Sequence, residues 1–161
     1  MATRAVAAFT LLVFLGACAR EMTELSQADQ DAVKAHIEKY RQTVVANDWD
    51  AMGNTLAADV VLSPPNVAPL AGRDAAIAWG KTFPRITGFT VNVEEVSGGG
   101  NLAFARGTYA LDMRLPDSSV ATDRGAFIEI HRRQADGTWP YTRLMFHSTE
   151  PVPAVAAAAK Q

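Results

Sequence analysis

The first half of the chain has apolar residues at helical spacing. Val33, Ile37, Tyr40 and Val44 form one apolar stripe, which predicts an amphipathic helix that ends near Ala46. Such a helix buries the stripe and exposes the polar residues between its members.

Residues that cap or break helices divide this half into segments. Ser26, followed by Asp29, has the spacing of a capping box and predicts the start of the first helix. Asn47-Asp48 predicts its end. Further elements are expected along the chain: a short helix over 49–56, a brief strand over 59–62 and a third helix that begins at Gly72-Arg73-Asp74.

The second half changes to a period of two, which predicts strands. They are expected over 86–96, 102–115, 120–133 and 139–148. Asp136-Gly137 is a strong hairpin signal between the last two strands. Helices that precede a mostly antiparallel sheet indicate an α+β fold, with a helical layer on one sheet face and a cavity between the layers.

Composition and charge narrow the class of protein. Of the 161 residues, 48% are hydrophobic and 20% are charged, so the chain can bury a core. The net charge is −2 and no basic run exceeds Arg132-Arg133, which argues against a nucleic-acid partner. Cys18 is the only cysteine and therefore excludes an internal disulfide or a cysteine-based zinc site.

Residues 1–17 are expected to be a signal peptide and no part of the fold. The apolar run from Ala5 to Leu15 is too short to span a bilayer as a helix. It ends in Leu15-Gly16-Ala17-Cys18, which resembles the bacterial lipobox, in which the cysteine is lipidated and becomes the N-terminus. With Ala19 after the cysteine, the resemblance implies a lipid anchor in the outer membrane, facing the periplasm.

A second cleavage pattern overlaps the first. Ala17-Cys18-Ala19 also fits ordinary secretory cleavage, which would discard Cys18 and give a soluble periplasmic or secreted protein. In the lipoprotein reading, residues 18–25 form a tether, 26–151 the folded domain and 152–161 a loosely ordered Ala/Pro tail.

Several short motifs follow one another over about residues 28–151. They are Tyr40 with Asp48, Gly72-Arg73-Asp74-Ala75, Ala103–Tyr109, Gly125–Glu129, Arg133–Trp139, and Phe146-His147-Ser148 with Pro151. In this order they resemble the NTF2-like superfamily, specifically its DUF4440 or SnoaL-like branch, which also includes ketosteroid isomerases. The resemblance implies a cone of three helices around a curved sheet, a central pocket and, often, a homodimer formed through the sheet.

The isomerase relatives suggest a specific chemistry. They hold an enol oxygen with a helix tyrosine and a neutral carboxylic acid, while an aspartate moves the proton. The resemblance puts Tyr40 at the tyrosine position, Glu129 near the acid position and Pro64 at the base position. Because proline cannot accept a proton, turnover by this route is not expected. The helix stripe explains Tyr40 equally well as a core residue.

The surroundings of Glu129 depend on the register of the hairpin. A two-residue turn at Asp136-Gly137 places Glu129 across from Leu144, where burial keeps the carboxyl neutral. A three-residue loop with Gly137 as a bulge places it across from Arg143, as an ion pair. The sequence leaves both registers open.

The histidines indicate neither a metal site nor a cofactor. His131 shares a strand face with Glu129, so it either forms a dyad with that residue or lies on the surface beside Arg132. A metal needs at least three converging ligands, and His36 is far from His131 and His147 in the predicted fold.

The predicted pocket has aromatic and flexible walls with few polar groups. Its expected lining is Tyr40, Trp79, Tyr109, Met113, Phe127 and Glu129. Leu144 stands where close relatives often have Asp, which makes the pocket more apolar. Such walls suit a small apolar or amphipathic molecule that bears one hydrogen-bonding oxygen.

We therefore expect binding of a small molecule without turnover. The alternative is an enzyme of the ketosteroid-isomerase or SnoaL type, an isomerase, cyclase or hydrolase, in which Tyr40 and Glu129 act with His131 or His147 as the proton carrier. A third possibility is a dimerising structural domain with a filled core and no ligand.

The last strand predicts a homodimer. It is expected to carry Trp139, Tyr141 and Met145 on one face and Leu144 and Phe146 on the other. One helical layer covers one face only, so the second face needs a partner.

Overall fold

The computed structural model describes residues 23–150. Its helices are α1 (Gln27–Ala46), α2 (Trp49–Gly53) and α3 (Arg73–Gly80). Its strands are β1 (Leu56–Ser63), β2 (Leu70–Ala71), β3 (Arg85–Gly99), β4 (Leu102–Arg114), β5 (Val120–Arg132) and β6 (Tyr141–Ser148). The expected signal peptide, Cys18 and the tail over 152–161 lie outside the described residues.

The ends of α1 follow the cap signals. Ser26 Oγ accepts a hydrogen bond from the backbone N–H of Asp29, which confirms the predicted cap. Asn47 ends the helix in the left-handed conformation, with φ 58°. Its amide side chain makes both hydrogen bonds to the backbone of Ile86, at 2.8 and 3.0 Å. Asn47 therefore ties the end of α1 to the edge strand β3.

All six strands form one curved, mixed sheet in the order β2-β1-β6-β5-β4-β3. Every neighbouring pair is antiparallel except β1 and β6, which are parallel. The predicted strand over 59–62 is the end of β1, whereas β2 was not predicted because two residues show no periodicity.

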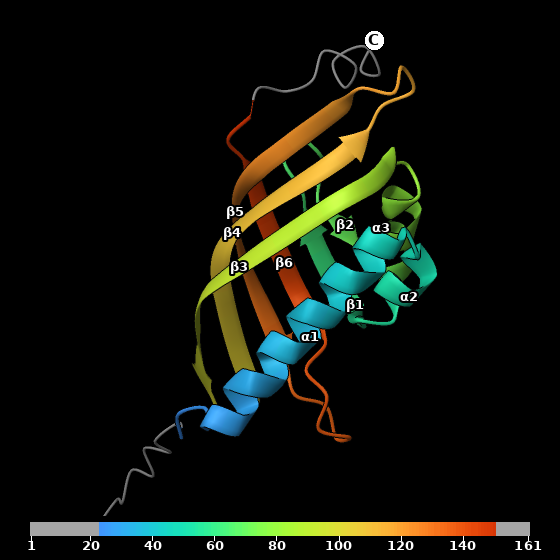
Figure 1. The fold of residues 1–161 in the computed structure, drawn as a ribbon. Coiled ribbons are helices and arrows are strands. Elements are labelled where there is room, and N and C mark those ends of the chain that lie inside the picture. The colour runs from blue at the N-terminus through green and yellow to red at the C-terminus, as the bar shows by residue number, and fades with distance from the viewer. Residues whose placement is uncertain (1–22, 151–161) are drawn as a thin grey trace, which may run out of the picture.

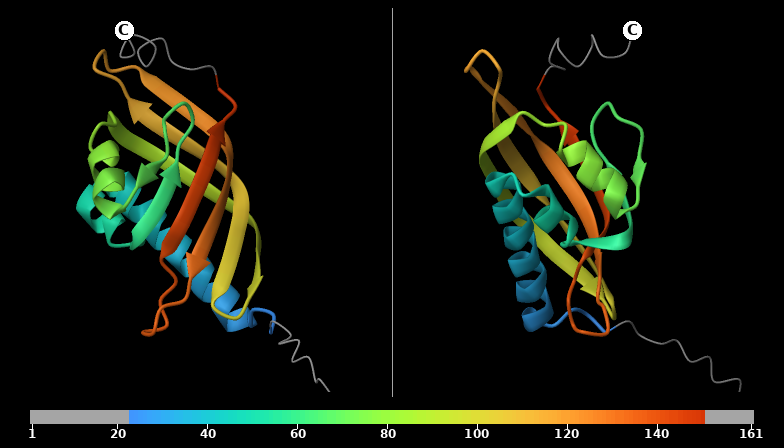
Figure 2. Two further views of the ribbon diagram at one scale, coloured as in Figure 1. Left: turned by 180° about the vertical axis from the view of Figure 1, so that it is seen from behind. Right: turned by 90° about the vertical axis from the view of Figure 1, so that its right-hand side faces the viewer.

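The helices cover the concave side of the sheet. Helix α1 runs along β3, while α2 and α3 lie near β1 and β2 (Figures 1 and 2). The predicted stripe is confirmed, because Val33, Ile37 and Val44 are buried against the sheet and Tyr40 is half-buried. The core is thus formed where one face of α1 meets the inner sheet face.

The β5–β6 hairpin combines features of both predicted alternatives. Gln134 accepts the N–H of Gly137 and donates its own N–H to Thr138, which gives the three-residue loop with Gly137 at φ 83°. A bulge at Thr142 then shifts the register by one residue. The bulge offsets the longer loop, so Glu129 pairs with Leu144, the register predicted for the shorter turn.

The same bulge changes the side to which Tyr141 points. Simple alternation places Tyr141 on the face of Met145, and this prediction is wrong. Tyr141 and Thr142 are both buried, at 1% and 2% exposure, and Tyr141 faces the helices together with Leu144. Met145 lies on the outer side of the sheet and is 57% exposed.

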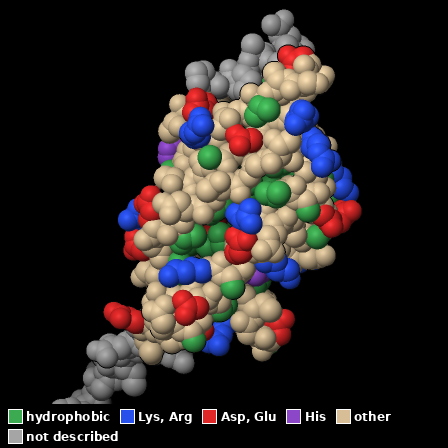
Figure 3. All heavy atoms as spheres, viewed as in Figure 1, with side chains coloured by type: hydrophobic (Ala, Val, Ile, Leu, Met, Phe, Trp, Pro, Cys, Tyr) green, Lys and Arg blue, Asp and Glu red, His purple; other side chains and the backbone are tan. Residues whose placement is uncertain are grey.

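The surface carries charges of both signs. Acidic and basic side chains are interspersed on the face shown in Figure 3. Arg106, for example, forms ion pairs with both Glu94 and Glu95. Within residues 23–150, no helix has the length and apolar character needed to cross a membrane.

Candidate functional site

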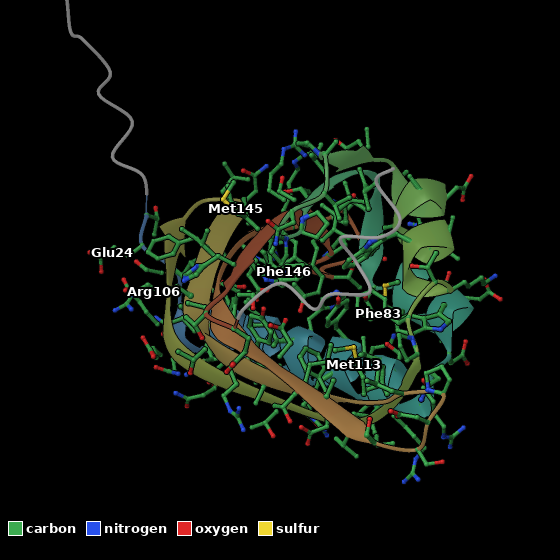
Figure 4. The ribbon with its side chains drawn as sticks, turned by 90° about the horizontal axis from the view of Figure 1, so that it is seen from above. Glu24, Phe83, Arg106, Met113, Met145 and Phe146 are labelled. Atoms are coloured by element: carbon green, nitrogen blue, oxygen red, sulfur yellow. The ribbon has the colours of Figure 1, made fainter. Side chains whose placement is uncertain are left out.

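A cavity of about 710 Å³ lies between the helices and the inner face of the sheet. This volume falls in the usual range of small-molecule pockets. Phe83, Met113 and Phe146 point into the interior around its open end, whereas Arg106 and Met145 lie outside the sheet (Figure 4). Most of the lining is apolar, so bound molecules gain free energy mainly from burial of apolar surface.

The structure brings the predicted pocket residues together. All of them line this cavity: Tyr40, Trp79, Tyr109, Met113, Phe127 and Glu129. Trp79 packs edge-on against Phe83 and also contacts Phe146, so it joins α3 to the sheet across the cavity wall.

Glu129 and His131 form a buried pair at the inner end of the cavity. The Nε2 atom of His131 is 3.2 Å from Oε1 of Glu129, and the two residues are 0% and 4% exposed. Burial raises the pKa of Glu129, while the hydrogen bond to His131 opposes this rise. The reading of His131 as a surface residue is therefore wrong, and the dyad exists.

The hydrogen bond of the second ring nitrogen of His131 determines how many protons the pair shares. Nδ1 is 2.9 Å from the carbonyl oxygen of Trp139, which only accepts hydrogen bonds, so Nδ1 carries hydrogen. The short contact between Nε2 and Glu129 then requires one proton, carried either by the carboxyl group or by the imidazole. The pair with that proton has no net charge.

Two phenol groups lie beside Glu129. The rings of Tyr40 and Tyr141 are 5.1 Å apart. Burial, and to a smaller extent the charge of the nearby Glu129, raises the pKa of both hydroxyls far above the usual value. Both phenols therefore stay protonated and can donate. The Tyr141 hydroxyl is buried and has no hydrogen-bond partner among the described residues. A buried donor without an acceptor is rare and costly in a native protein.

His36 supports this inner end from α1. Its Nε2 atom is 2.8 Å from the carbonyl oxygen of Thr55, and its ring contacts those of His131 and Tyr141. The expectation that His36 lies far from His131 is therefore wrong, because α1 packs across the inner face of the sheet. Burial lowers the pKa of His36, and the nearby His131 and Lys39 lower it further, against the opposing effect of the hydrogen bond. The imidazole is therefore held in its neutral form above the inner end.

A second polar group lies near the open end of the cavity. The Tyr109 hydroxyl donates to Oδ2 of Asp123 at 2.8 Å, and Ser148 Oγ donates to the other carboxylate oxygen. Burial and this carboxylate raise the pKa of Tyr109 above its usual range. Tyr109 therefore contributes to the cavity through Asp123, since its own hydroxyl is already occupied.

Sequence reasoning missed Tyr141 and Asp123. A register shift hides Tyr141, and Asp123 lies in a polar stretch that is typical of an exposed strand end. Pro64, expected at the base position of the isomerase relatives, is buried just after β1 and does not line the cavity, although Pro65 does. His147 is exposed on the outer face, so it is not placed to carry protons for this cavity.

The described residues offer no site for a metal. Over 23–150, no group of three or more His, Cys, Asp or Glu side chains converges as metal binding requires. What the arrangement offers is hydrogen-bond donors at one end, a carboxylate at the other and an apolar surface between them.

A family model described as the SnoaL-like domain matches residues 37–142 of the chain. This region contains α2, α3, most of the sheet and the cavity residues from Tyr40 to Tyr141. No curated protein sequence matches the chain.

Solved structures share the fold at low sequence identity. A ketosteroid isomerase-like protein from Erwinia carotovora atroseptica matches with a TM-score of 0.71 and 18% identity, over 78% of this chain and 100% of its own. A conserved protein from Planctomyces limnophilus has a TM-score of 0.69 and 19% identity, over 77% and 98%. An NTF2-like protein with a cystatin-like fold from Novosphingobium aromaticivorans has a TM-score of 0.59 and 20% identity, over 83% and 90%. The chain therefore has an α+β NTF2-like fold.

Proposed function

The chain belongs to the SnoaL-like domain family, and we propose that it binds a small apolar or amphipathic molecule in its cavity without turning it over. The observation that carries the proposal is the buried Tyr141 hydroxyl, which has no acceptor within the described protein. An oxygen of the ligand would supply that acceptor. Tyr40 would donate to the same oxygen, and Glu129 would join when it holds the shared proton.

The position of the carboxyl groups supports binding without turnover. Among the described residues, Asp123, Glu129 and Glu150 are the carboxyl groups that line the cavity. The segment at Pro64 and Pro65, where the relatives' base is expected, carries none. A carbon next to the bound oxygen therefore has no base at the position from which the relatives remove its proton.

A matched pair of probes tests the proposal. 1-Tetralone carries a ketone oxygen, whereas tetralin has the same bicyclic shape without it. Trp49 and Trp79 line the cavity, so binding can be followed by tryptophan fluorescence. We expect the ketone to bind at least about tenfold more tightly than the hydrocarbon, and the difference to vanish when Tyr40 and Tyr141 are both changed to Phe. Equal binding of the two probes would refute the proposal.

One observation favours the enzyme as a second candidate. The Glu129–His131 pair holds a transferable proton beside the two phenols, so this pair can act as the acid or base of an isomerase, cyclase or hydrolase. Incubation with a β,γ-unsaturated ketone and detection of its conjugated isomer tests this candidate. If turnover occurs and Glu129→Gln abolishes it while leaving ketone binding intact, the binding-only proposal is wrong.

We further propose a homodimer formed through the outer sheet face. Ile128 pairs with Met145 across β5 and β6, and the two side chains are 49% and 57% exposed. Ile130, on the same face, is 38% exposed. A second copy would cover this apolar area, which is costly to leave in water.

The proposed location is the bacterial envelope, with Cys18 as the lipidated N-terminus and the outer membrane facing the periplasm as the site. The support is the lipobox-like sequence before the only cysteine. A soluble periplasmic or secreted protein remains the alternative outcome, since the same residues fit ordinary cleavage.

A further inference from the structure

The polar groups of the cavity are concentrated at its two ends. Tyr40 and Tyr141 lie beside Glu129 at the inner end, and Asp123, which accepts from Tyr109, lies near the open end. Glu129 and Asp123 are both on the inner face of β5, and at about 3.3 Å per residue the strand rises by about 20 Å between them. The lining between the two ends is mainly apolar, with Phe127 on the same strand.

The open end keeps Asp123 in place with several contacts. Tyr109 and Ser148 each donate to one of its carboxylate oxygens. Gly125 leaves room for the tyrosine, since a Cβ at this position would lie 2.9 Å from Cε1 of Tyr109 and 1.8 Å from the carbonyl oxygen of His147. A carboxylate offers about four acceptor positions, so the two protein donors leave capacity for a donor from a bound molecule.

The two ends differ in their unused hydrogen-bonding capacity, which is a donor at the inner end and an acceptor at the open end. At the inner end the Tyr141 hydroxyl is buried and has no acceptor among residues 23–150, which is the observation that carries the proposed function. At the open end the carboxylate of Asp123 keeps acceptor capacity and lines a cavity that is mostly apolar. Glu150 lies nearby but forms an ion pair with Arg124 at 3.5 Å, so Asp123 is the better acceptor.

We propose that the ligand is two-ended, with a carbonyl-type oxygen that accepts from Tyr40 and Tyr141 and, across an elongated apolar body, a hydroxyl or protonated amine that donates to Asp123. This inference rests on the proposed function and specifies its ligand class. The inner end selects a neutral acceptor, because its acid–imidazole pair brings no net positive charge to a bound anion. Tyr109 is a positioning residue, which acts by holding the carboxylate.

Matched linear probes test the inference: methyl ketones of nine to thirteen carbons, about the length that the strand allows, each with a terminal methyl, hydroxyl or ammonium group. Binding is measured by tryptophan fluorescence for the wild-type protein and for Asp123→Asn. The control is Asp112→Asn, because Asp112 accepts from Thr122 on the neighbouring strand and does not line the cavity. Thermal melting verifies that both variants are folded.

At the best chain length, we expect the terminal donor to raise the affinity of the wild-type protein about tenfold over the plain ketone. That advantage should disappear in Asp123→Asn and remain in Asp112→Asn, while the plain ketone binds all three proteins equally. If plain and donor-bearing ketones bind the wild-type protein equally, or if the advantage survives in Asp123→Asn, the two-ended ligand is refuted and the proposed function stands. If no linear ketone binds at any length, the two-ended ligand is refuted, and equal binding of 1-tetralone and tetralin then refutes the proposed function as well.

Discussion

Nε2 of His131 lies 3.2 Å from Oε1 of Glu129, while Nδ1 of the same ring is bonded to a backbone carbonyl. The imidazole therefore has one nitrogen left for the carboxyl group, and the two groups need one proton between them. As long as that proton is present, the buried pair is neutral. The inner end of the cavity thus combines an acid, a base and two phenols without a net charge.

Loss of the shared proton should destabilise the protein. Burial raises the pKa of Glu129 above its ordinary value of 4.5, so the folded state binds this proton more tightly than the unfolded state does. The resulting stabilisation is complete below about pH 4.5 and is lost as the pH rises through the folded-state pKa. In Glu129→Gln the amide N–H can still donate to His131 but does not titrate.

We therefore expect the stability of the wild-type protein to fall, relative to Glu129→Gln, as the pH rises from 5 towards 9. Urea unfolding at several pH values measures the difference. The control is Glu94→Gln, which changes a carboxylate on the surface. Parallel curves for the wild-type protein and Glu129→Gln would contradict the assignment of the proton to this pair.

Most of the fold could be predicted from local periodicity in the sequence. The stripe from Val33 to Val44 and the alternation in the later strands depend on residues close in the sequence, and both appear at nearly the predicted bounds. Strand β2 could not be predicted from the sequence, because its two residues are too few to show a period and form a strand only by pairing with β1.

The candidate site was less predictable, since it depends on one inserted residue. Thr142 buries its hydroxyl against the carbonyl oxygen of Ile130 and forms the bulge, so Tyr141 turns towards the cavity. A rule of alternation assigns Tyr141 to the opposite face. Asp123 was missed for a related reason, because Tyr109 and Ser148 approach it only through the pairing of three strands.

Gly125 should tolerate no side chain. The Cβ of Gly125→Ala would lie 1.8 Å from the carbonyl oxygen of His147, so β5 and β6 would have to separate. We expect a loss of about 3 kcal/mol in unfolding free energy, at the upper end for overpacking. Gly100→Ala is the control: nothing lies within 4 Å, so only the φ of 63° opposes it, at about 1 kcal/mol. Similar melting temperatures for both variants would contradict the close approach at Gly125.

The proposed dimer depends on the outer face of the sheet. A charge at Ile128, as in Ile128→Asp, would be buried against the second copy, so we expect a dimeric wild-type protein and a monomeric variant at micromolar concentration. Light scattering measures the mass of each. Val120→Asp is the control, because Val120 is 56% exposed but lies at the far end of β5. A monomeric wild-type protein would refute the interface.

The envelope anchor is tested by Cys18→Ser. If Cys18 carries lipid, the wild-type protein should partition into the membrane fraction and the variant into the soluble fraction, since a hydroxyl at this position is not a substrate for thioether formation. Intact mass of the purified protein provides a second readout, because the acyl chains add mass to the N-terminal residue. Equal distribution of the two proteins, with no added mass on the wild type, would favour ordinary cleavage.

Tyr141 should show opposite effects on stability and on binding. Its buried hydroxyl has no acceptor in the described protein, so Tyr141→Phe removes an unsatisfied donor and should stabilise the empty protein by about 1 kcal/mol. The same change removes a donor to the ligand oxygen, so 1-tetralone should bind about tenfold more weakly, while tetralin binds as before. Thr142→Val is the matched control, because its hydroxyl is bonded to Ile130 and should cost stability when removed. A Tyr141→Phe protein that is less stable, with unchanged ketone affinity, would mean that the hydroxyl serves the fold and not a ligand.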